Sequence, residues 1–229
     1  MAKPKSQSRL QSLQGLKRNE RQQMDALELL KDLPLRNFGV ILADPPWSFK
    51  SYTALQMQNP ESGRHVERHY DTMSLDDIKA LPIASLAAPT GCHLFLWATG
   101  PCLPQAFEVM EAWGFKYSSV AFTWAKLKRS HVSEQMNALH TIDSDFHVGL
   151  GLTTRKNCEF CLLGRRGNAR RNAKDVREIL IAPVREHSRK PDEAHRRIER
   201  YADGPYLELF GREQHNGWTV RGDQVGKFK

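Results

Sequence analysis

The sequence has no long hydrophobic run and few cysteines. No apolar stretch approaches the roughly 20 residues that cross a bilayer, so we expect no membrane-spanning segment and no membrane partner. The N-terminus, MAKPKSQSR, is polar, which argues against a signal peptide. The four cysteines (Cys92, Cys102, Cys158 and Cys161) are too few for a disulfide scaffold in 229 residues. We therefore expect a reduced, cytoplasmic protein, associated with a nucleoid or lying in a host-cell cytoplasm.

Acidic residues are scarce relative to basic ones. The 26 Asp and Glu face 34 Lys and Arg, which leaves a formal charge of +8. Such a surplus favours a polyanionic partner, because cations placed on phosphates release condensed counterions. Signals for metal are weak, since Cys158 and Cys161 have no second Cys pair and His65 and His69 form the one HxxxH spacing among the nine histidines. We expect buried thiols and no metal.

The chain divides into an arm and a domain. Residues 1–22 hold six cations and one acid among Ser and Gln, which predicts a basic flexible arm. A solvated tail and a nucleic-acid-binding arm are both consistent with that composition. Residues 23–229 are long enough for one domain with its own core. Within them, residues 48–68 and 127–150 are irregular and typical of lids or substrate-binding loops.

Short apolar runs alternate with helix-like segments from residue 38 onward. The runs show little polar alternation, which is typical of strands buried on both faces: 38–43, 94–97, 120–124, 160–163, 179–184 and 206–210. Between them we expect helices at a Ser74/Asp77 capping box, from Pro104 to Gly114, and from Pro191 to Gly204. We expect the helix between Pro104 and Gly114 to bury one face that carries Phe107, Met110 and Trp113. We expect the helix between Pro191 and Gly204 to bury Ala194, Ile198 and Tyr201. Strand and helix alternate throughout, which predicts a single doubly wound, mostly parallel α/β sheet.

A rigid corner, Asp44-Pro45-Pro46-Trp47, follows the first strand. Ligands of open α/β sheets bind beyond the carboxyl ends of the strands. The two prolines fix φ and have no N–H group, so they hold their carbonyls outward. The Asp44 carboxylate and the Pro45 carbonyl can each accept an N–H, and Trp47 can stack on a ring. The corner suits a flat ring bearing an amino group; the alternative is an acidic turn with Trp47 packed in the core.

Alkylation of an exocyclic adenine amine needs such a corner. Its lone pair is delocalised into the ring, and two acceptors that pull the amine toward tetrahedral geometry free that pair and stabilise the developing positive charge. The methyl donor must then lie in line, about 3–3.5 Å away.

The segment ILADPPW resembles the fourth motif of amino-methyltransferases that act on nucleic acids. Its Trp is similar to that of the DPPW-type N6-adenine methyltransferase family, which includes the mRNA-adenosine methyltransferase catalytic subunit and bacterial and phage DNA adenine methyltransferases. The resemblance covers about residues 38–225 in ordered blocks, among them HYDTMSLDDIKAL, LFLWATG, REHSRKPDEAHRRIERY, ELFGR and HNGWTVRGDQV. It implies a Rossmann-like fold of the S-adenosylmethionine-dependent type.

The resemblance also implies roles for individual residues. Asp44 and Pro45 would hold the target amine, Pro46 would fix the corner and Trp47 would stack near the base, with Tyr70 and Trp97 close by. A core position is the alternative for Tyr70. The implied cofactor is S-adenosyl-L-methionine. Its expected contacts are the following: Lys190 for the methionine carboxylate, at a helix N-terminus; Glu208, Phe210, Gly211, Arg212, His215 and Asn216 for the ribose and adenosine; Asp223 and Gln224 for the adenine.

Two departures from the family pattern affect the adenine contacts. The usual Gly-Asn-Gln is Gly222-Asp223-Gln224 here, and residues 31–36 stand where the eukaryotic members have Cys-Asp-Ile-Arg.

Basic residues follow two of the expected strands. We expect both groups to bind nucleic acid beside a base pocket that Trp47, Tyr70 and Trp97 line, although a solvated face is the alternative. They are Lys126, Lys128 and Arg129, and Arg165, Arg166, Arg170 and Arg171.

The expected function is site-specific methylation of adenine N6 in DNA. We expect a bacterial or phage protein that is a monomer or homodimer. DNA is expected rather than RNA because this chain is compact and does not show the long N-terminal extension with zinc fingers that the eukaryotic RNA enzymes carry. This is an argument by analogy. The alternatives are the same chemistry on RNA adenosine, a catalytically inactive nucleic-acid-binding partner subunit, and a small-molecule amine methyltransferase. The intact corner and Lys190 argue against the inactive subunit.

Overall fold

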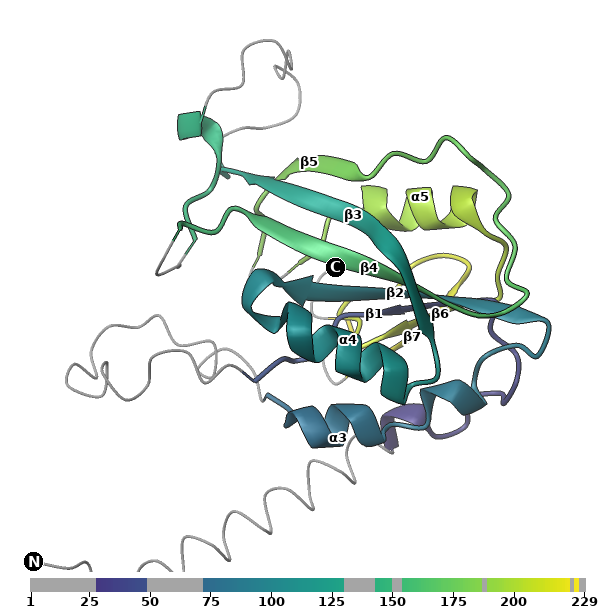
Figure 1. Cartoon of the computed structure of the whole chain (residues 1–229). Coiled ribbons are helices and arrows are strands. Elements are labelled where there is room, and N and C mark those ends of the chain that lie inside the picture. The colour runs from purple at the N-terminus through teal and green to yellow at the C-terminus, as the bar shows by residue number, and fades with distance from the viewer. Residues whose placement is uncertain are drawn as a thin grey trace, which may run out of the picture.

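A seven-stranded mixed sheet forms the centre of the molecule (Figure 1). The computed structural model describes residues 28–48, 72–129, 143–149, 154–186, 189–222 and 225–226. The strand order is β5-β3-β4-β2-β1-β6-β7. The strands are β1 (Val40–Ala43), β2 (Gly91–Thr99), β3 (Lys116–Leu127), β4 (Cys158–Gly167), β5 (Ile179–Pro183), β6 (Tyr206–Leu209) and β7 (Trp218–Arg221). Of these seven, only β4 runs antiparallel to its neighbours, so the predicted mostly parallel α/β sheet is confirmed.

Helices cover both faces of the sheet. Helices α3 (Leu75–Ala80) and α4 (Leu103–Ala112) pack on one face, and α5 (Glu193–Tyr201) packs on the other (Figure 1). Short 3-10 turns are η2 (Ile83–Ser85), η3 (Gly100–Cys102) and η6 (Asp143–Asp145). Successive side chains of β1 alternate between the two cores: Ile41 joins the α3/α4 side, and Val40 and Leu42 join the α5 side. This two-sided burial explains the unbroken apolar run in the sequence. None of the described helices is long and apolar enough to cross a membrane.

The expected helix signals are found at the helix ends. The Ser74 side chain accepts a hydrogen bond from the Asp77 N–H at 3.1 Å and caps α3. Pro104 lies in the first turn of α4, and Gly114 takes a φ of +75° just beyond it. The expected burial of Phe107 is wrong, because this side chain is 41% exposed. Its ring meets Tyr117 edge-on at the surface, and Val109 faces the core instead.

Strict alternation of strand and helix is also wrong. Among the described residues, no α-helix separates β3 from β4, and residues 168–178 contain none between β4 and β5. Strand β7 was not expected, because only Trp218 and Val220 of its four residues are buried and the apolar run is too short to detect. Strand β3 is longer than the run 120–124, which is part of its more buried half.

Strand direction determines which residues share an edge of the sheet. Ala43 at the end of β1 pairs with Leu96 of β2 and Leu209 of β6, so these parallel strands end at the same edge. Strand β4 begins at this edge, because Glu159 pairs with Thr99 at the end of β2. The expected arm 1–22, and most of the expected loops 48–68 and 127–150, lie outside the described residues.

Candidate active site

The Asp44–Trp47 corner is held by backbone hydrogen bonds on both sides. The Asp44 N–H donates to the Leu209 carbonyl at 3.4 Å, which continues the β1–β6 pairing by one residue. The Trp47 N–H donates to the Pro45 carbonyl at 2.8 Å, and the Met73 N–H donates to the Pro46 carbonyl at 3.0 Å. A carbonyl oxygen has two lone pairs, so the Pro45 oxygen keeps one for a ligand N–H.

The two tryptophans near the corner are buried. Trp47 Nε1 donates to the Trp97 carbonyl at 2.9 Å, and the Trp47 ring packs in the α3/α4 core. This is the position that the alternative interpretation of Trp47 expects, and stacking of Trp47 on a base stays a prediction. Trp97 lies in the α5-side core, with the Lys190 ammonium 5.6 Å from its ring centroid. Tyr70, the third expected aromatic, lies outside the described residues.

An alternating cluster of two ammonium groups and two carboxylates lies at the corner. Lys190 Nζ donates to Asp44 Oδ2 at 2.5 Å and lies 3.2 Å from Glu159 Oε2. Glu159 also pairs with Lys126, whose ammonium lies 4.9 Å from the Trp124 ring centroid. The side chains of Lys190 and Glu159 are only 10% and 11% exposed. Buried charges need such pairing, because an unpaired one costs several kcal/mol.

Burial and pairing act in opposite directions on these groups. Burial raises the pKa of the Asp44 carboxyl above its ordinary value, although Lys190 opposes the shift. Burial also raises the pKa of Glu159, but Lys190 and Lys126 outweigh it and lower this pKa to about 2. Burial lowers the pKa of Lys190, yet Asp44 and Glu159 outweigh it and raise the pKa above the ordinary lysine value. Lys190 and Glu159 are therefore charged at neutral pH.

Sequence reasoning missed Glu159. It precedes the apolar run 160–163, and although the family resemblance extends over residues 149–167, no role was assigned to it there. The available signal is an acid directly before an apolar run. That signal becomes informative only once β4 is known to run antiparallel, which brings Glu159 to the edge where Asp44 lies.

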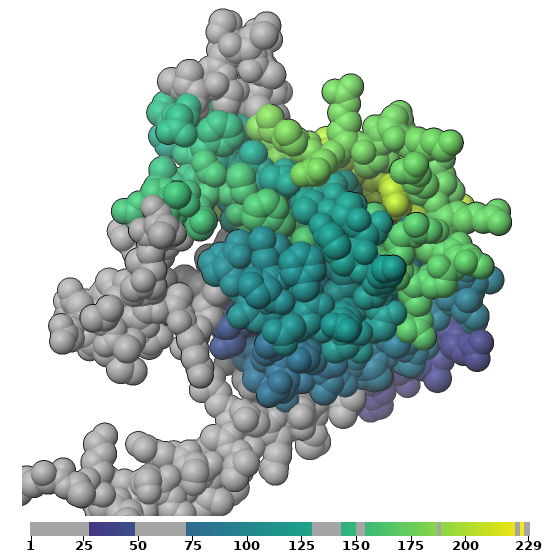
Figure 2. All heavy atoms as spheres, in the orientation of Figure 1, coloured from purple at the N-terminus to yellow at the C-terminus, as the bar shows by residue number. Residues whose placement is uncertain are grey.

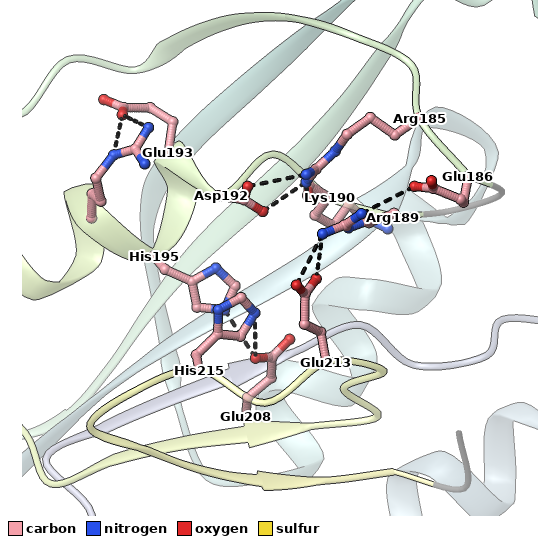
Figure 3. A network of polar contacts seen from close by, with 11 residues as sticks. Arg185, Glu186, Arg189, Lys190, Asp192, Glu193, His195, Glu208, Glu213 and His215 are labelled. Carbon is pink, nitrogen blue, oxygen red and sulfur yellow. Dashed lines mark hydrogen bonds and ion pairs between the residues drawn. The ribbon is translucent and has the colours of Figure 1, made fainter. Parts of the chain in front are cut away.

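A second polar cluster joins α5 to the β6–β7 connection (Figure 3). His195 of α5 lies with Nε2 at 2.9 Å from Oε2 of Glu208 on β6, and His215 Nε2 is 3.8 Å from the same oxygen. The two imidazole rings stack with centroids 3.8 Å apart and planes 28° apart. Burial lowers the pKa of His215, although Glu208 opposes the shift, so the neutral ring is favoured.

Arginines hold the segment that precedes α5. Arg189 pairs with Glu186 and with Glu213, the latter at 2.7 Å, and Arg185 pairs with Asp192 at 2.7 Å (Figure 3). These ion pairs join the residues on either side of Lys190 to α5 and to the chain after β6. They fix the backbone from which Lys190 reaches Asp44.

The structure brings several of the expected cofactor residues together. Glu208 lies at the carboxyl end of β6, and Phe210 turns the chain there with a φ of +63°. Gly211 is required by close approach, because a Cβ would lie 2.4 Å from Val220 Cγ1 and 3.1 Å from the Glu208 carboxyl carbon. Arg212 is close enough to Asp44 to lower its pKa, against the larger effect of burial. Asn216 is exposed in the turn before β7, and Asp223 and Gln224 lie outside the described residues.

These residues fit the implied cofactor by their chemistry. Lys190 is a buried cation at the carboxyl edge of a parallel sheet, which suits a carboxylate. Glu208 is an acid at the end of a neighbouring strand, the position from which α/β folds bind ribose hydroxyls. Gly211 lets the chain turn closely around Glu208, because a side chain there would collide with Val220 and push against the Glu208 carboxyl group.

His195, Glu208 and His215 also form a group that could hold a metal ion, with their ligand atoms within 4.8 Å of one another. The ring geometry argues against this use. The nitrogen lone pairs lie in the ring planes, and stacked rings direct them side by side rather than toward one point. The cluster therefore suits hydrogen bonding to a ligand, and the absence of a metal stays a prediction.

The two groups of expected nucleic-acid residues lie at opposite edges of the sheet, one where the parallel strands end and the other where they begin. Lys126 belongs to the ion cluster, and Lys128 and Arg129 are exposed beyond the end of β3 at the same edge. The expectation that the arginines also flank the base pocket is wrong. Strand β4 is antiparallel, so Arg165 pairs with His93 at the start of β2, four residues before Trp97. Arg166, Arg170 and Arg171 follow it at that far edge, where the β4–β5 connection lies (Figure 1).

Comparison with known proteins shows which family shares these features. The MT-A70 family model matches residues 38–224, which include the corner, Glu159, Lys190 and Glu208. An N(6)-adenosine-methyltransferase MT-A70-like protein of Arabidopsis thaliana is 34% identical over 194 residues, 83% of this chain and 24% of that protein. The human N(6)-adenosine-methyltransferase catalytic subunit METTL3 is 31% identical over 83% of this chain and 29% of its own length.

A relative of similar size is the type II methyltransferase M.MunI of Mycoplasma sp. It is 28% identical over 211 residues, 86% of this chain and 82% of that protein. By contrast, the match spans only about a quarter of the length of the plant relatives. Since the family model extends from the residues before β1 to those after β7, the chain belongs to the MT-A70 family.

Proposed function

We propose that this protein transfers a methyl group from S-adenosyl-L-methionine to the exocyclic N6 amine of adenine in DNA. The observation that carries the proposal is the corner itself, where the Asp44 carboxylate lies beside the buried Lys190 ammonium and is followed directly by the Pro45 carbonyl. Two hydrogen-bond acceptors and a cation at the carboxyl edge of a parallel sheet suit an amine and an anionic cofactor side by side. The relatives named as N(6)-adenosine methyltransferases support the choice of amine.

The cofactor would supply an electrophilic methyl group on a sulfonium sulfur. Lys190 would bind its carboxylate, and Glu208 with His215 would accept and donate hydrogen bonds at the ribose hydroxyls. Both sets of residues lie at the carboxyl edge of the sheet, on the strands and loops that flank β1.

Lys190 also controls the availability of Asp44. In this structure its ammonium donates to Asp44 Oδ2, the oxygen that an amine N–H would need. A bound carboxylate adds a third anionic partner of Lys190 to Asp44 and Glu159, and it weakens the contact between Lys190 and Asp44. Asp44 and the Pro45 carbonyl then accept the two amine hydrogens, which directs the nitrogen lone pair toward the methyl carbon.

The proton balance assigns a second task to Asp44. When the nitrogen–carbon bond forms and the sulfur–carbon bond breaks, the amine nitrogen becomes positive and must lose a proton. Burial raises the pKa of Asp44, which makes its carboxylate a better acceptor for that proton than an exposed aspartate. The products are N6-methyladenine, the neutral thioether and a proton that passes to solvent.

The choice of DNA is supported by the relative named as the type II methyltransferase M.MunI, which this chain matches over 82% of that protein at 28% identity. RNA is the second candidate, because the adenosine-named relatives are the more identical, at 34% against 28%. We propose a monomer or homodimer as the active form.

Two assays test the proposal. The first is expression in a host without adenine methylation, followed by mapping of N6-methyladenine in the host DNA, where modified adenines in a common sequence are expected. The second compares purified protein on DNA and RNA of one sequence. Methylation of RNA alone would overturn the choice of DNA, and binding of the cofactor with no transfer to either polymer would favour an inactive partner subunit. Transfer to a free nucleoside but to neither polymer would favour a small-molecule methyltransferase.

A further inference from the structure

The edge of the sheet opposite Asp44 carries an open pocket of about 800 Å³. It lies between the first half of β3, the end of β4 and the last turn of α5. Both sites can be placed along β2. Arg165 on the rim of the pocket pairs with His93 of β2. Asp44 directly follows Ala43, which pairs with Leu96 of β2, so Asp44 lies beside Trp97. Four residues of strand separate these two positions on β2, roughly 13 Å at about 3.3 Å per residue. The pocket is therefore distinct from the proposed site of methyl transfer.

The rim of this pocket is strongly basic. Arg165, Arg170 and Arg171 line it, and the lining includes one acid, Glu178, which already accepts a hydrogen bond from Thr123 at 2.8 Å. Arg165 donates to the Ala169 carbonyl at 2.8 Å. In the described part of the chain, no residue pairs with the side chain of Arg170 or Arg171, and both are exposed. Their exposure leaves these two side chains open to an anion. Figure 2 shows the space-filling surface of this face of the molecule, with residues about 155–185 in green.

The wall of the pocket is aromatic. Tyr201 meets Phe95 edge-on at 5.8 Å and His93 edge-on at 5.1 Å, and Phe95 stacks on Phe122. The Tyr201 side chain is partly exposed, and its hydroxyl has no partner among the described residues. A planar ligand ring can therefore pack against Tyr201 and bond to its hydroxyl.

A buried hydrogen-bond acceptor also lines the pocket. His93 is 2% exposed, and its Nε2 lies 3.1 Å from the Arg170 carbonyl. A carbonyl only accepts hydrogen bonds, so Nε2 carries the hydrogen, and burial lowers the pKa of His93 and keeps the ring neutral. Nδ1 is then an acceptor, and it is buried with no partner in the described structure. Such an atom is costly to leave unmatched, and a ligand N–H or O–H would satisfy it.

These three features together specify one class of ligand. The arginines suit phosphate, Tyr201 suits a planar ring, and His93 Nδ1 suits an N–H or O–H group. We propose that this pocket binds a nucleoside phosphate, either as a free nucleotide or as one unit of a polynucleotide. The proposal goes beyond the proposed methyl transfer and does not depend on it.

The test uses ligands without adenine, so that neither the target-base site nor a site for the cofactor's adenosine is occupied. Binding of a fluorescein-labelled oligothymidylate of about twelve nucleotides is followed by anisotropy, with thymidine triphosphate and inorganic pyrophosphate as competitors. We expect Arg170→Gln/Arg171→Gln to weaken binding about tenfold or more, because each arginine–phosphate contact is charge-assisted. The control Lys31→Gln/Lys79→Gln removes the same charge elsewhere on the surface and should change affinity less than about threefold.

The competitors distinguish the two sources of the ligand. Displacement by thymidine triphosphate at comparable concentration supports a free nucleotide, and displacement only by longer strands supports a polynucleotide. Tyr201→Phe should weaken the nucleotide about threefold or more and leave pyrophosphate unchanged. Equal competition by pyrophosphate, equal affinity of the arginine variant and the wild type, or no binding at all would each overturn the proposal. All of these readings are independent of whether the protein methylates DNA.

Discussion

Asp44 has two partners that compete for it, the Lys190 ammonium and the proposed adenine amine. Asp44→Asn keeps the shape of the side chain, removes its charge and offers one acceptor instead of two oxygens. We expect methyl transfer to fall by about 100-fold or more, because the developing positive charge on nitrogen loses its counter-charge. Initial rates with labelled cofactor measure the loss. Asp175→Asn, a change of the same kind at an exposed ion pair with Arg200, should retain activity within a few-fold, and a wild-type rate in Asp44→Asn would remove Asp44 from the mechanism.

Glu159 holds two ammonium groups in the same cluster. Glu159→Gln leaves Lys126 without its carboxylate and Lys190 with Asp44 alone. We expect the free energy of unfolding to fall by about 1–3 kcal/mol, the cost of leaving buried charged groups undersatisfied. Urea unfolding measures this, with Glu108→Gln as the control, because the exposed Lys79–Glu108 pair should contribute less than about 1 kcal/mol. Equal losses of unfolding free energy in the two variants would show that Glu159 contributes no more to stability than an exposed ion pair does.

The pKa of Glu159 also predicts a pH dependence. Its folded pKa, about 2, lies below the ordinary 4.5, so its stabilisation is complete above pH 4.5 and declines as the pH falls toward 2. The raised pKa of Asp44 acts in the opposite direction, since protonation of that carboxyl favours the folded state. Urea unfolding between pH 6 and 3 should therefore show a steeper loss of stability in the wild type than in Glu159→Gln. Parallel curves of stability against pH for the two proteins would contradict the lowered pKa of Glu159.

At the scale of the elements, β5 is an edge strand with apolar side chains in solvent. Ile179 is 60% exposed, and the outward carbonyls of Arg177 and Ile179 accept hydrogen bonds from Arg197 of α5 at 2.6 and 2.8 Å. Edge strands with open backbone groups pair with other chains. Arg197→Ala should therefore increase aggregation, measured by light scattering at rising protein concentration. Arg196→Ala removes a neighbouring arginine whose side chain pairs, among the described residues, with Glu193 alone, and this variant should leave scattering unchanged. If both variants scatter alike, Arg197 does not protect the edge strand.

At the scale of the whole molecule, the sheet separates two basic regions. Lys128 and Arg129 lie at the edge where Asp44 is found, and the arginines after β4 lie at the other. If a polynucleotide crosses the Asp44 edge, Lys128→Gln/Arg129→Gln should weaken binding and reduce the slope of log affinity against log salt by up to about 2. Filter binding of DNA across a salt series measures the slope, and an unchanged slope would exclude contacts at this edge.

Much of the fold follows from local patterns in the sequence. The buried centres of five strands, the Ser74 cap of α3 and the end of α4 at Gly114 were predictable, because burial, capping and turn chemistry act over a few residues. The expected burial of 179–184 on both faces is wrong, because β5 lies at the side of the sheet and leaves Ile179 and Ile181 60% and 44% exposed. Strand β7 was not, since its alternating pattern of four residues carries little signal. Phe107 was misplaced because a surface contact with Tyr117 competes with burial in the core.

The amino-acid sequence alone determined the Asp44 corner, since an apolar strand followed by two prolines leaves the backbone few conformations and places an acid beyond the strand. Only the tertiary structure decided what surrounds that corner. Side-chain periodicity is the same for a parallel and an antiparallel strand, so the direction of β4 could not be inferred from its residues. That direction brings Glu159 to Asp44 and Lys190, and it carries the four arginines to the opposite edge of the sheet.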